Sequence, residues 1–375
     1  MKIYYWSPFL TNIATIKSVI RSAKSITKYK KSKNVNSVKI LNASGEWDNY
    51  RSIPGVKIEN MYPFSFHKFL PKTGFIQSRF AFLIISIFNF FPLLFKIKKD
   101  KPDFLIIHLL TFLPIILSPF LSKNTKIILR VSGLPKLTFF RKFVWRLFSS
   151  YIFKITVPTK KTLEILKNCK IFDLSKINLL RDPAIDQEEI LKNKNKPIPK
   201  VYQNKKYLLS IGRLTQQKNF SFLIKMFIKY KKLTNVDFLL IIGDGEKKKD
   251  LQKLITTSNF ENYIHLIGFK KNVYNYIKNS EAIISTAEYE DPGFVLLESA
   301  YLKKKIVTSL VANGPIEMKK SGDFCLFFKL NNEKSFVNAL KKLKNKNTNK
   351  INKAKNYSKK FLTNQHLKNL LEILN

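Results

Sequence analysis

Carboxylates gather in one short stretch of this 375-residue chain, although the chain as a whole is strongly basic. Lys and Arg number 68 against 25 Asp and Glu, which gives a formal net charge of +43. The segment 285–300 nevertheless holds four acids, namely Glu288, Glu290, Asp291 and Glu298. Glu290 is expected on a loop and Glu298 about a turn inside the following helix. A carboxylate at that position can accept hydrogen bonds from two neighbouring hydroxyl groups.

The same stretch offers an anion site at the start of that helix. The Pro-Gly pair before the helix suits its first positions. The backbone N–H groups of Gly293, Phe294 and Val295 are then free to hold an anion. A charged helix start, which the helix dipole favours, is the plainer explanation for Asp291. It does not explain Glu298, which would stand on an otherwise apolar helix.

A second segment, 211–219, supplies positive charge between a strand and a helix. Gly212 follows the strand, and Arg213 and Lys218 come after it, five positions apart. Two cations near a helix start suit a diphosphate, whose charge must be neutralised and whose oxygens must be bridged. A solvated surface lysine is the alternative interpretation in so basic a chain.

Glycine is informative because the chain contains only 11 of them. Several follow strands directly in the second half, where glycine permits positive φ and a close approach of the backbone to a ligand. Gly243 and Gly268 are such positions, and the turn at Gly243 is expected to border the site. Ordinary turn chemistry is the alternative, and it is the preferred interpretation for Gly322.

Strand-like and helix-like segments alternate along the chain, which predicts an α/β protein with parallel sheets. The expected strands are 2–6, 37–41, 104–108, 126–131 and 154–158, then 207–211, 237–242, 264–266, 282–285 and 306–308. We predict two Rossmann-like, doubly wound domains, 1–190 and 207–355, joined by a Pro- and Lys-containing linker at 191–206. A C-terminal helix at 356–375 is expected to pack back on the first domain. Ligands should bind beyond the carboxyl ends of the strands, in a cleft between the domains.

The order Gly-Arg…Lys, Gly-Asp-Gly-Glu, Gly-Phe and Glu-x7-Glu resembles the retaining glycosyltransferases of family 4 (group 1), which have the GT-B fold. The resemblance is strong over 207–328 and fainter over the first half. It implies that Arg213 and Lys218 hold the diphosphate of a nucleotide-sugar donor, that Glu290 contacts the transferred sugar and that Glu298 binds the ribose. The remaining donor-binding positions that it implies are Gly212, Gly243, Gly268, Phe269, Val273, Gly293, Phe294 and Val295.

The resemblance places the acceptor in the first domain. His108, at the end of a strand, matches a position near the reacting carbon, although a lone histidine can equally be a core residue. Arg130 and Ser132 end the next strand and are expected on the acceptor side of the cleft. One departure concerns the loop 7–12, which reads Ser-Pro-Phe-Leu-Thr-Asn where the family usually has Gly-Gly.

These features predict a hexosyltransferase-type enzyme (EC 2.4) that retains anomeric configuration. It would move a sugar from a nucleotide sugar to a glycan or lipid-linked acceptor in cell-envelope polysaccharide or lipopolysaccharide synthesis. No Asp-x-Asp motif is present, so neither a metal nor another cofactor is expected, and the cations would stabilise the leaving group. The alternatives are a nucleotide-sugar epimerase of the same fold and a non-catalytic basic protein that binds membrane or RNA.

The basic charge suggests a polyanion partner, although A/T-rich codons for Lys, Asn, Ile and Phe can also produce it. The basic residues are spread along the chain, so no nucleic-acid partner is expected. The apolar segment 80–95 is shorter than a spanning helix, and four lysines follow it closely. It is expected either to lie on an anionic membrane surface or to be a core helix. With two distant cysteines and no secretory signal, the expected location is cytoplasmic, peripheral on the inner face of the plasma membrane.

Overall fold

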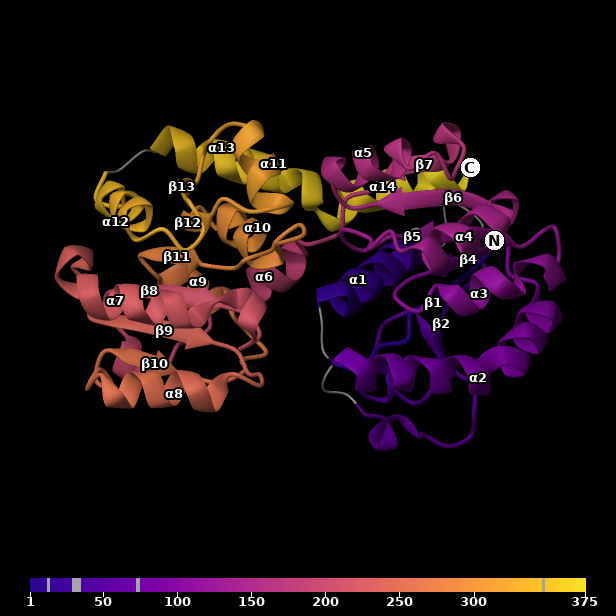
Figure 1. Ribbon diagram of the computed structural model, residues 1–375, viewed down its shortest axis with the longest axis horizontal. Helices are drawn as coiled ribbons and strands as arrows, with labels where there is room; N and C mark the ends of the chain where they lie inside the picture. The colour runs from indigo at the N-terminus through magenta and orange to yellow at the C-terminus, as the bar shows by residue number, and fades with distance from the viewer. Residues whose placement is uncertain (12–13, 29–34, 72–74, 346–347) are drawn as a thin grey trace. The chain divides into compact units, whose positions relative to one another are not determined.

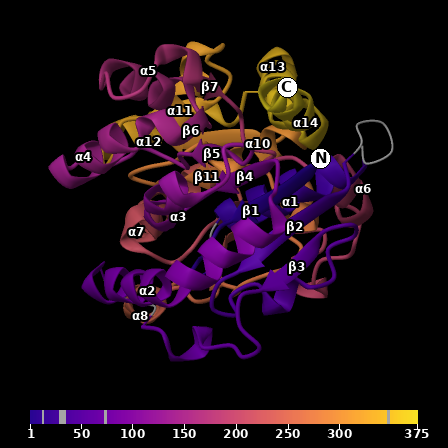
Figure 2. The same cartoon turned by 90° about the vertical axis from the view of Figure 1, so that its right-hand side faces the viewer.

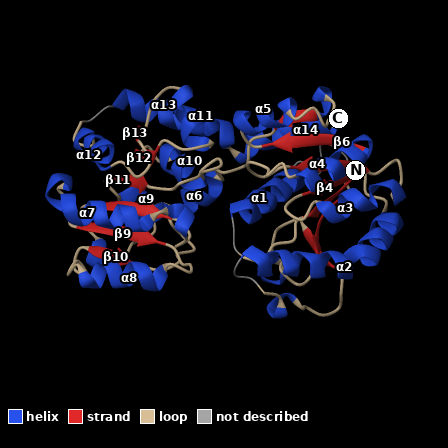
Figure 3. Cartoon of the chain, viewed as in Figure 1, coloured by secondary structure: helices blue, strands red, loops and turns tan. Residues whose placement is uncertain are grey.

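The computed structural model describes residues 1–11, 14–28, 35–71, 75–345 and 348–375, and the chain forms two compact units (Figure 1). The N-terminal unit consists of residues 1–183 and 363–375, and the C-terminal unit consists of residues 184–362. Each unit has one parallel sheet with helices on both faces (Figure 3). Residue 12, in the loop that departs from the family pattern, lies outside the described residues.

The sheet of the N-terminal unit has seven parallel strands in the order β3-β2-β1-β4-β5-β6-β7. The central strands β1, β4 and β5 are apolar and are buried on both faces, as is typical of parallel strands, whereas the edge strand β3 is more exposed. In register, Trp6 lies beside Leu41 of one neighbour and Ile107 of the other. The strands are β1 (Lys2–Trp6), β2 (Ser37–Asn42), β3 (Lys57–Asn60), β4 (Phe104–Ile107), β5 (Lys126–Arg130), β6 (Ile152–Val157) and β7 (Ile177–Leu179).

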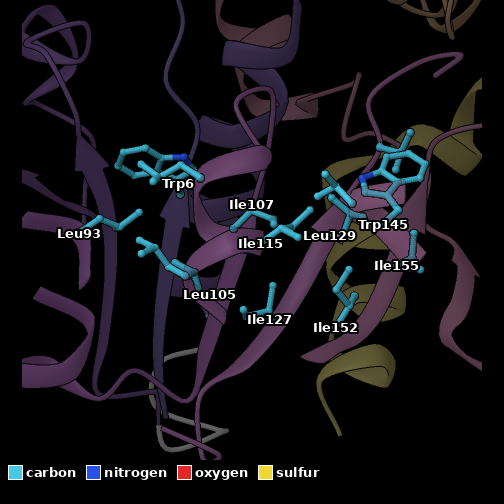
Figure 4. Close-up of a cluster of buried hydrophobic side chains, with 14 of the residues drawn as sticks. Trp6, Leu93, Leu105, Ile107, Ile115, Ile127, Leu129, Trp145, Ile152 and Ile155 are labelled. Atoms are coloured by element: carbon cyan, nitrogen blue, oxygen red, sulfur yellow. The ribbon is translucent and has the colours of Figure 1, made fainter. Parts of the chain in front are cut away.

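Helices cover both faces of this sheet. One hydrophobic core lies beneath α2 (Phe75–Asp100), α3 (Phe112–Leu117), α4 (Phe139–Leu147) and α5 (Lys160–Asn168). Figure 4 shows part of this core, where Leu93 of α2, Ile115 of α3 and Trp145 of α4 lie among the strand residues. The core on the opposite face includes side chains of α1 (Ala14–Lys28) and α14 (Thr363–Leu374).

The C-terminal unit repeats the plan with six parallel strands in the order β10-β9-β8-β11-β12-β13. The strands are β8 (Tyr207–Ile211), β9 (Phe238–Ile242), β10 (Ile264–Leu266), β11 (Ala282–Ser285), β12 (Lys305–Ser309) and β13 (Leu326–Phe328). One core lies under α6 (Gln187–Asn193), α9 (Tyr274–Asn279), α10 (Phe294–Tyr301), α11 (Gly314–Lys320) and α13 (Thr348–Ser358). The other lies under α7 (Phe220–Thr234), α8 (Lys248–Thr257) and α12 (Glu333–Lys342).

The prediction of two doubly wound α/β units is confirmed, and every predicted strand is present within two residues at each end. Three strands were missed, β3, β7 and β13, and all three lie at sheet edges. They are only three or four residues long. Such short segments carry too little periodicity to be recognised from sequence.

The predicted linker at 191–206 differs from the structure. The chain passes from the N-terminal to the C-terminal unit at Pro183–Ala184 and returns at Leu362–Thr363. Segment 191–206 belongs to the C-terminal unit, where Ile198 and Tyr202 are buried beside Ile190 of α6. Its prolines and lysines resembled a linker because they interrupt regular structure, but its few apolar side chains anchor it to the core.

Candidate functional site

The predicted donor residues meet at one end of the C-terminal sheet. Strands β8 and β11 are neighbours at the point where the strand order reverses. Loop 212–219 leaves the carboxyl end of β8, and loop 286–293 leaves the carboxyl end of β11. Such a switch point is where doubly wound sheets bind ligands, because the two loops diverge to opposite faces.

Hydrogen bonds fasten these two loops together. Gln217 Nε2 donates to the carbonyl of Tyr289 (2.9 Å), and the Glu288 N–H donates to the carbonyl of Gln217 (2.8 Å). The Thr286 hydroxyl donates to the carbonyl of Asn219 (3.0 Å). The positions of the cationic loop and the acidic loop are therefore fixed relative to each other before any ligand binds.

An ion pair between Lys218 and Glu290 connects the basic segment 211–219 with the acidic segment 285–300. Lys218 Nζ lies 2.6 Å from Glu290 Oε1, and the side chains are 21% and 13% exposed. The Glu290 backbone is held as well, since its N–H donates to the carbonyl of Ala312 (3.0 Å) and its carbonyl accepts from the N–H of Gly314 (2.9 Å). The ammonium and carboxylate thus have defined positions at the solvent edge of the sheet.

Two of the glycines serve packing between the loops. A methyl group built on Gly212 would come 3.2 Å from three carbons of the Lys218 side chain, so the lysine lies across this glycine. At Gly243, φ is +155° and an added Cβ would lie 1.8 Å from the Gly212 carbonyl oxygen. Gly243 therefore lets two backbone segments touch, and through Gly212 it supports the position of Lys218.

Glu298 lies on α10, one turn inside the helix that follows the acidic loop. Its side chain is buried, and the hydroxyl of Tyr274 donates to its Oε1 (3.2 Å). Gly293 is the residue before the helix, with φ +88°, and no side chain caps the first turn. Phe294 and Val295, the first residues of the helix, are half-buried. The position of Glu298, one turn inside the helix, is the one that the sequence predicted.

The remaining predicted donor residues follow β8 and β10 in the C-terminal unit. Arg213 is exposed directly after β8. Gly268 has φ +71° and a Cβ added to it would meet open space, and the next residue, Phe269, is 70% exposed. Val273 is buried at the start of α9. Sequence reasoning missed Gln217, Thr286 and Tyr274. Their polar side chains flank the predicted residues, but nothing in the sequence shows which backbone or carboxylate they contact.

His108 follows β4 in the N-terminal unit and is 4% exposed. Its Nδ1 is buried and finds no hydrogen-bond partner among the described residues. Burial first, and then the nearby charge of Arg130, lowers the pKa of His108 to about 3. The imidazole is therefore neutral at pH 7, which suits both interpretations given above, a core residue and a group near a reacting carbon.

The buried position of Arg130 differs from the expectation that this residue lies on the acceptor side of a cleft. It is only 3% exposed, and its guanidinium donates to the carbonyl of Leu180 (2.6 Å) and to Asp182 Oδ1 (2.6 Å). Asp182 also accepts from the hydroxyl of Ser18 (2.7 Å). Arg130 therefore joins strand ends inside the N-terminal unit, whereas Ser132, two residues later, is exposed.

A small polar cavity of about 110 Å³ lies in the N-terminal unit, at the carboxyl ends of β2 and β3. Its side chains bond mainly to one another. Asn42 Nδ2 donates to Asp48 Oδ1 (3.0 Å) and Asn60 Oδ1 (2.9 Å), and Arg51 donates to Asp48 Oδ1 (2.8 Å). Ligand pockets usually measure roughly 300–1,000 Å³. The cavity is therefore a packing feature of the β2–β3 loops and not a competing donor site.

Comparison with known proteins connects one segment of the chain with a family. Residues 192–361 match the family model described as Glycosyl transferases group 1. The chain carries a group 1 glycosyltransferase domain. The matched segment contains every residue of the predicted donor cluster, and over this segment the resemblance to group 1 glycosyltransferases is confirmed. Within the described residues, no group of three or more His, Cys, Asp or Glu is placed to hold a metal ion.

Two curated relatives are similar to parts of this chain. An uncharacterized glycosyltransferase of Methanocaldococcus jannaschii is 28% identical over 240 residues, 59% of each chain. The N-acetylgalactosamine-N,N'-diacetylbacillosaminyl-diphospho-undecaprenol 4-alpha-N-acetylgalactosaminyltransferase of Campylobacter jejuni is 32% identical over 158 residues, 42% of each chain. The chain thus spans about half the length of the curated relatives it matches.

A solved structure extends the likeness to both units. Anabaena HepE in complex with UDP-glucose superposes with a TM-score of 0.71, covering 99% of this chain and 98% of HepE. The sequence identity is 14%, so the likeness concerns the fold. Together with the two parallel-sheet units, it confirms the predicted GT-B fold.

Proposed function

We propose that this chain is a retaining glycosyltransferase that moves a sugar from a nucleotide-sugar donor to a glycan or lipid-linked acceptor. The observation that carries the proposal is the Lys218–Glu290 pair at the switch point, with Glu298 on the helix that follows. The names of the relatives support transfer chemistry, and the Campylobacter name describes an acceptor carried on diphospho-undecaprenol. That name also favours a role in cell-envelope glycan synthesis.

In this proposal each side chain has a defined task. Arg213 and Lys218 neutralise the donor diphosphate, and the uncapped start of α10 adds N–H groups to the same end of the sheet. Charge that develops on the leaving diphosphate then meets cations that are already in position, which lowers the barrier electrostatically. Glu290 contacts the transferred sugar, and Glu298 accepts hydrogen bonds from the ribose hydroxyls.

Retention follows if the acceptor hydroxyl attacks on the face from which the diphosphate leaves. The departing phosphate oxygen can then take the acceptor proton, so the protein needs no carboxylate nucleophile. Because Arg213 and Lys218 supply positive charge to the leaving group, we also propose that transfer requires no divalent ion. Activity that persists in excess EDTA is the expected result, and loss of activity that Mg²⁺ or Mn²⁺ restores would contradict it.

A donor screen followed by a transfer assay tests the proposal. UDP-, GDP- and ADP-sugars are compared for thermal stabilisation, since a ligand at 100 times its Kd adds about 2.7 kcal/mol. The donor that stabilises most is then used with lipid-linked and glycan acceptors. Glu298→Gln should weaken donor stabilisation and transfer strongly, whereas Glu281→Gln, an exposed control in the same unit, should change neither. Equal activity of the two variants would refute the assignment.

The alternatives receive less support. An epimerase would convert the donor without an acceptor, so product formation from the sugar nucleotide alone would favour it. An RNA-binding protein would show steeply salt-dependent affinity for RNA and no stabilisation by sugar nucleotides. The named relatives are glycosyltransferases, and their names favour transfer over both epimerisation and RNA binding.

A further inference from the structure

Helix α2 is apolar on two faces, and only one of them is used by the fold. Its inner face contributes Ala81, Ile85, Leu93 and Ile97 to the core of the N-terminal unit, and Asn89 donates to the carbonyl of Ala43 (3.1 Å). Its outer face repeats large apolar side chains every three or four residues, and these are 54–80% exposed. They are Ile76, Phe80, Leu83, Ile87, Phe91 and Phe95.

A second exposed apolar group lies on α4, in the same helical layer. Its inner residues Val144 and Trp145 enter the core that also holds α2, and Figure 4 shows Trp145 there. Its outer residues are 55–88% exposed, and they are Phe139, Phe140, Phe143 and Leu147. The ring of Phe112 on α3 lies 5.5 Å from that of Phe140, which places α3 beside α4. In Figures 1 and 2 the three helices lie along one side of this unit's sheet.

The sequence that contains these helices is strongly basic. Between residues 61 and 160 the sequence holds sixteen Lys and Arg, and its only acids are Asp100 and Asp103. Asp100 is already bound to Tyr4 and Lys39 at the end of α2. Two effects lower the pKa of Arg141 on α4. The larger is the partial burial of Arg141 itself, and the smaller is the nearby positive charge of Arg79, near the start of α2. Two like charges at the edge of apolar surface favour an anionic partner.

We propose that the outer faces of α2 and α4 form one docking surface for an anionic lipid bilayer. Phenylalanine rings would enter the acyl–headgroup boundary, while Arg79, Arg141 and Lys142 contact lipid phosphates. Exposed apolar area of this extent, next to basic residues, is the pattern of a protein that binds the membrane interface.

The helix lies on the bilayer and does not cross it. By length and composition, 76–100 could span a membrane. However, its inner face is part of the sheet core, and its last turn is tied to the sheet by Lys96–Glu59 (2.7 Å) and Lys39–Asp100 (3.0 Å) ion pairs. Spanning would require these contacts to break. A second copy of the chain is a poor occupant of the surface, because it would bring the same positive charge against it.

Vesicle flotation without a sugar nucleotide tests the surface independently of the proposed transfer activity. The full chain should bind phosphatidylglycerol-containing vesicles and bind pure phosphatidylcholine weakly, and 0.5 M salt should reduce binding. Phe80→Gln/Phe91→Gln and Phe139→Gln/Phe143→Gln should each weaken binding at least about tenfold. Lys142→Glu should weaken it by more than about fivefold.

Leu174→Gln is the matched control, since Leu174 is 58% exposed on the same unit but lies outside α2 and α4. It should bind as the unchanged chain does. Unchanged melting temperatures and circular dichroism establish that the variants are folded. Binding by both double variants at the level of the Leu174 control would overturn the proposal. So would a salt-resistant dimer that the double variants abolish, or resistance to alkaline extraction, which indicates a spanning helix.

Discussion

Replacing Lys218 with methionine is expected to abolish sugar transfer while leaving the protein folded. Methionine keeps an unbranched side chain that can lie across Gly212, as the lysine methylenes do, but it removes the ammonium group. The loss therefore isolates the charge from the packing. Lys218→Arg is the companion variant, because it retains the positive charge and changes only its geometry.

The substitution should have two effects of different size, a small loss of folding stability and a large loss of transfer rate. The Lys218–Glu290 pair is short and partly exposed, so losing the ammonium should lower the free energy of unfolding by only about 1–2 kcal/mol. Losing a preorganised group that stabilises transition-state charge costs roughly 10²–10³-fold in rate. A protein with about 5–15 kcal/mol of stability stays almost fully folded after the first loss, so unfolding cannot account for the second.

The assay measures initial transfer rates with the donor that the stabilisation screen selects, alongside denaturant unfolding of each variant. Lys218→Met/Glu290→Gln should recover most of the lost stability, because the carboxylate is no longer left unpaired, but it should not recover transfer. If Lys218→Met transfers sugar within about threefold of the unchanged chain, the leaving-group role of this lysine is refuted.

Three further results are expected from unfolding measurements. Gly243→Ala should lower the free energy of unfolding by about 3 kcal/mol or more, because its Cβ would meet a carbonyl oxygen at 1.8 Å. Gly268→Ala, where the Cβ meets open space and φ is +71°, should lower it by only about 1–2 kcal/mol. Equal losses in the two variants would contradict the loop-packing argument. Arg130→Met should lower the free energy of unfolding by about 3–5 kcal/mol, because it leaves the buried Asp182 without its ion-pair partner. Arg130→Met/Asp182→Asn should recover at least half of this lost stability. No recovery would show that the broken ion pair is not the cause of the loss. Burial lowers the pKa of His366 to about 4, so protonation favours the unfolded chain below about pH 6.5. Between pH 7 and pH 5, this histidine should lower the free energy of unfolding by about 2 kcal/mol. His366→Gln should reduce this dependence of stability on pH.

Much of the fold was readable because parallel strands leave a strong signal. Runs such as 207–211 and 282–285 are continuous apolar segments, and loops with Gly or acidic residues follow them. That pattern located both halves of the donor cluster. The direct contact of Lys218 with Glu290 was not predictable, because it depends on which strands become neighbours across 72 positions of sequence.

Burial was the harder property to predict. Arg130 stands at the end of a strand, where a functional cation is expected, and nothing local reveals the buried Asp182 that binds it. In the same way, 80–95 is apolar on all sides in sequence, so periodicity could not show which stripe enters the core and which stays exposed. Both outcomes are decided by side chains that arrive from distant parts of the chain.

The division of the chain has a consequence for how the protein is made. The N-terminal unit is completed by α14, whose His366 contacts Ser22 across 344 positions of sequence, and whose Leu367 and Leu370 fill the core beside α1. The C-terminal unit is contained within 184–362, and its two ends are joined where the Ile185 N–H donates to the carbonyl of Phe361 (3.0 Å). During synthesis on a ribosome, the unit that begins second therefore finishes first. The one that begins first waits with an open hydrophobic face until its last helix emerges.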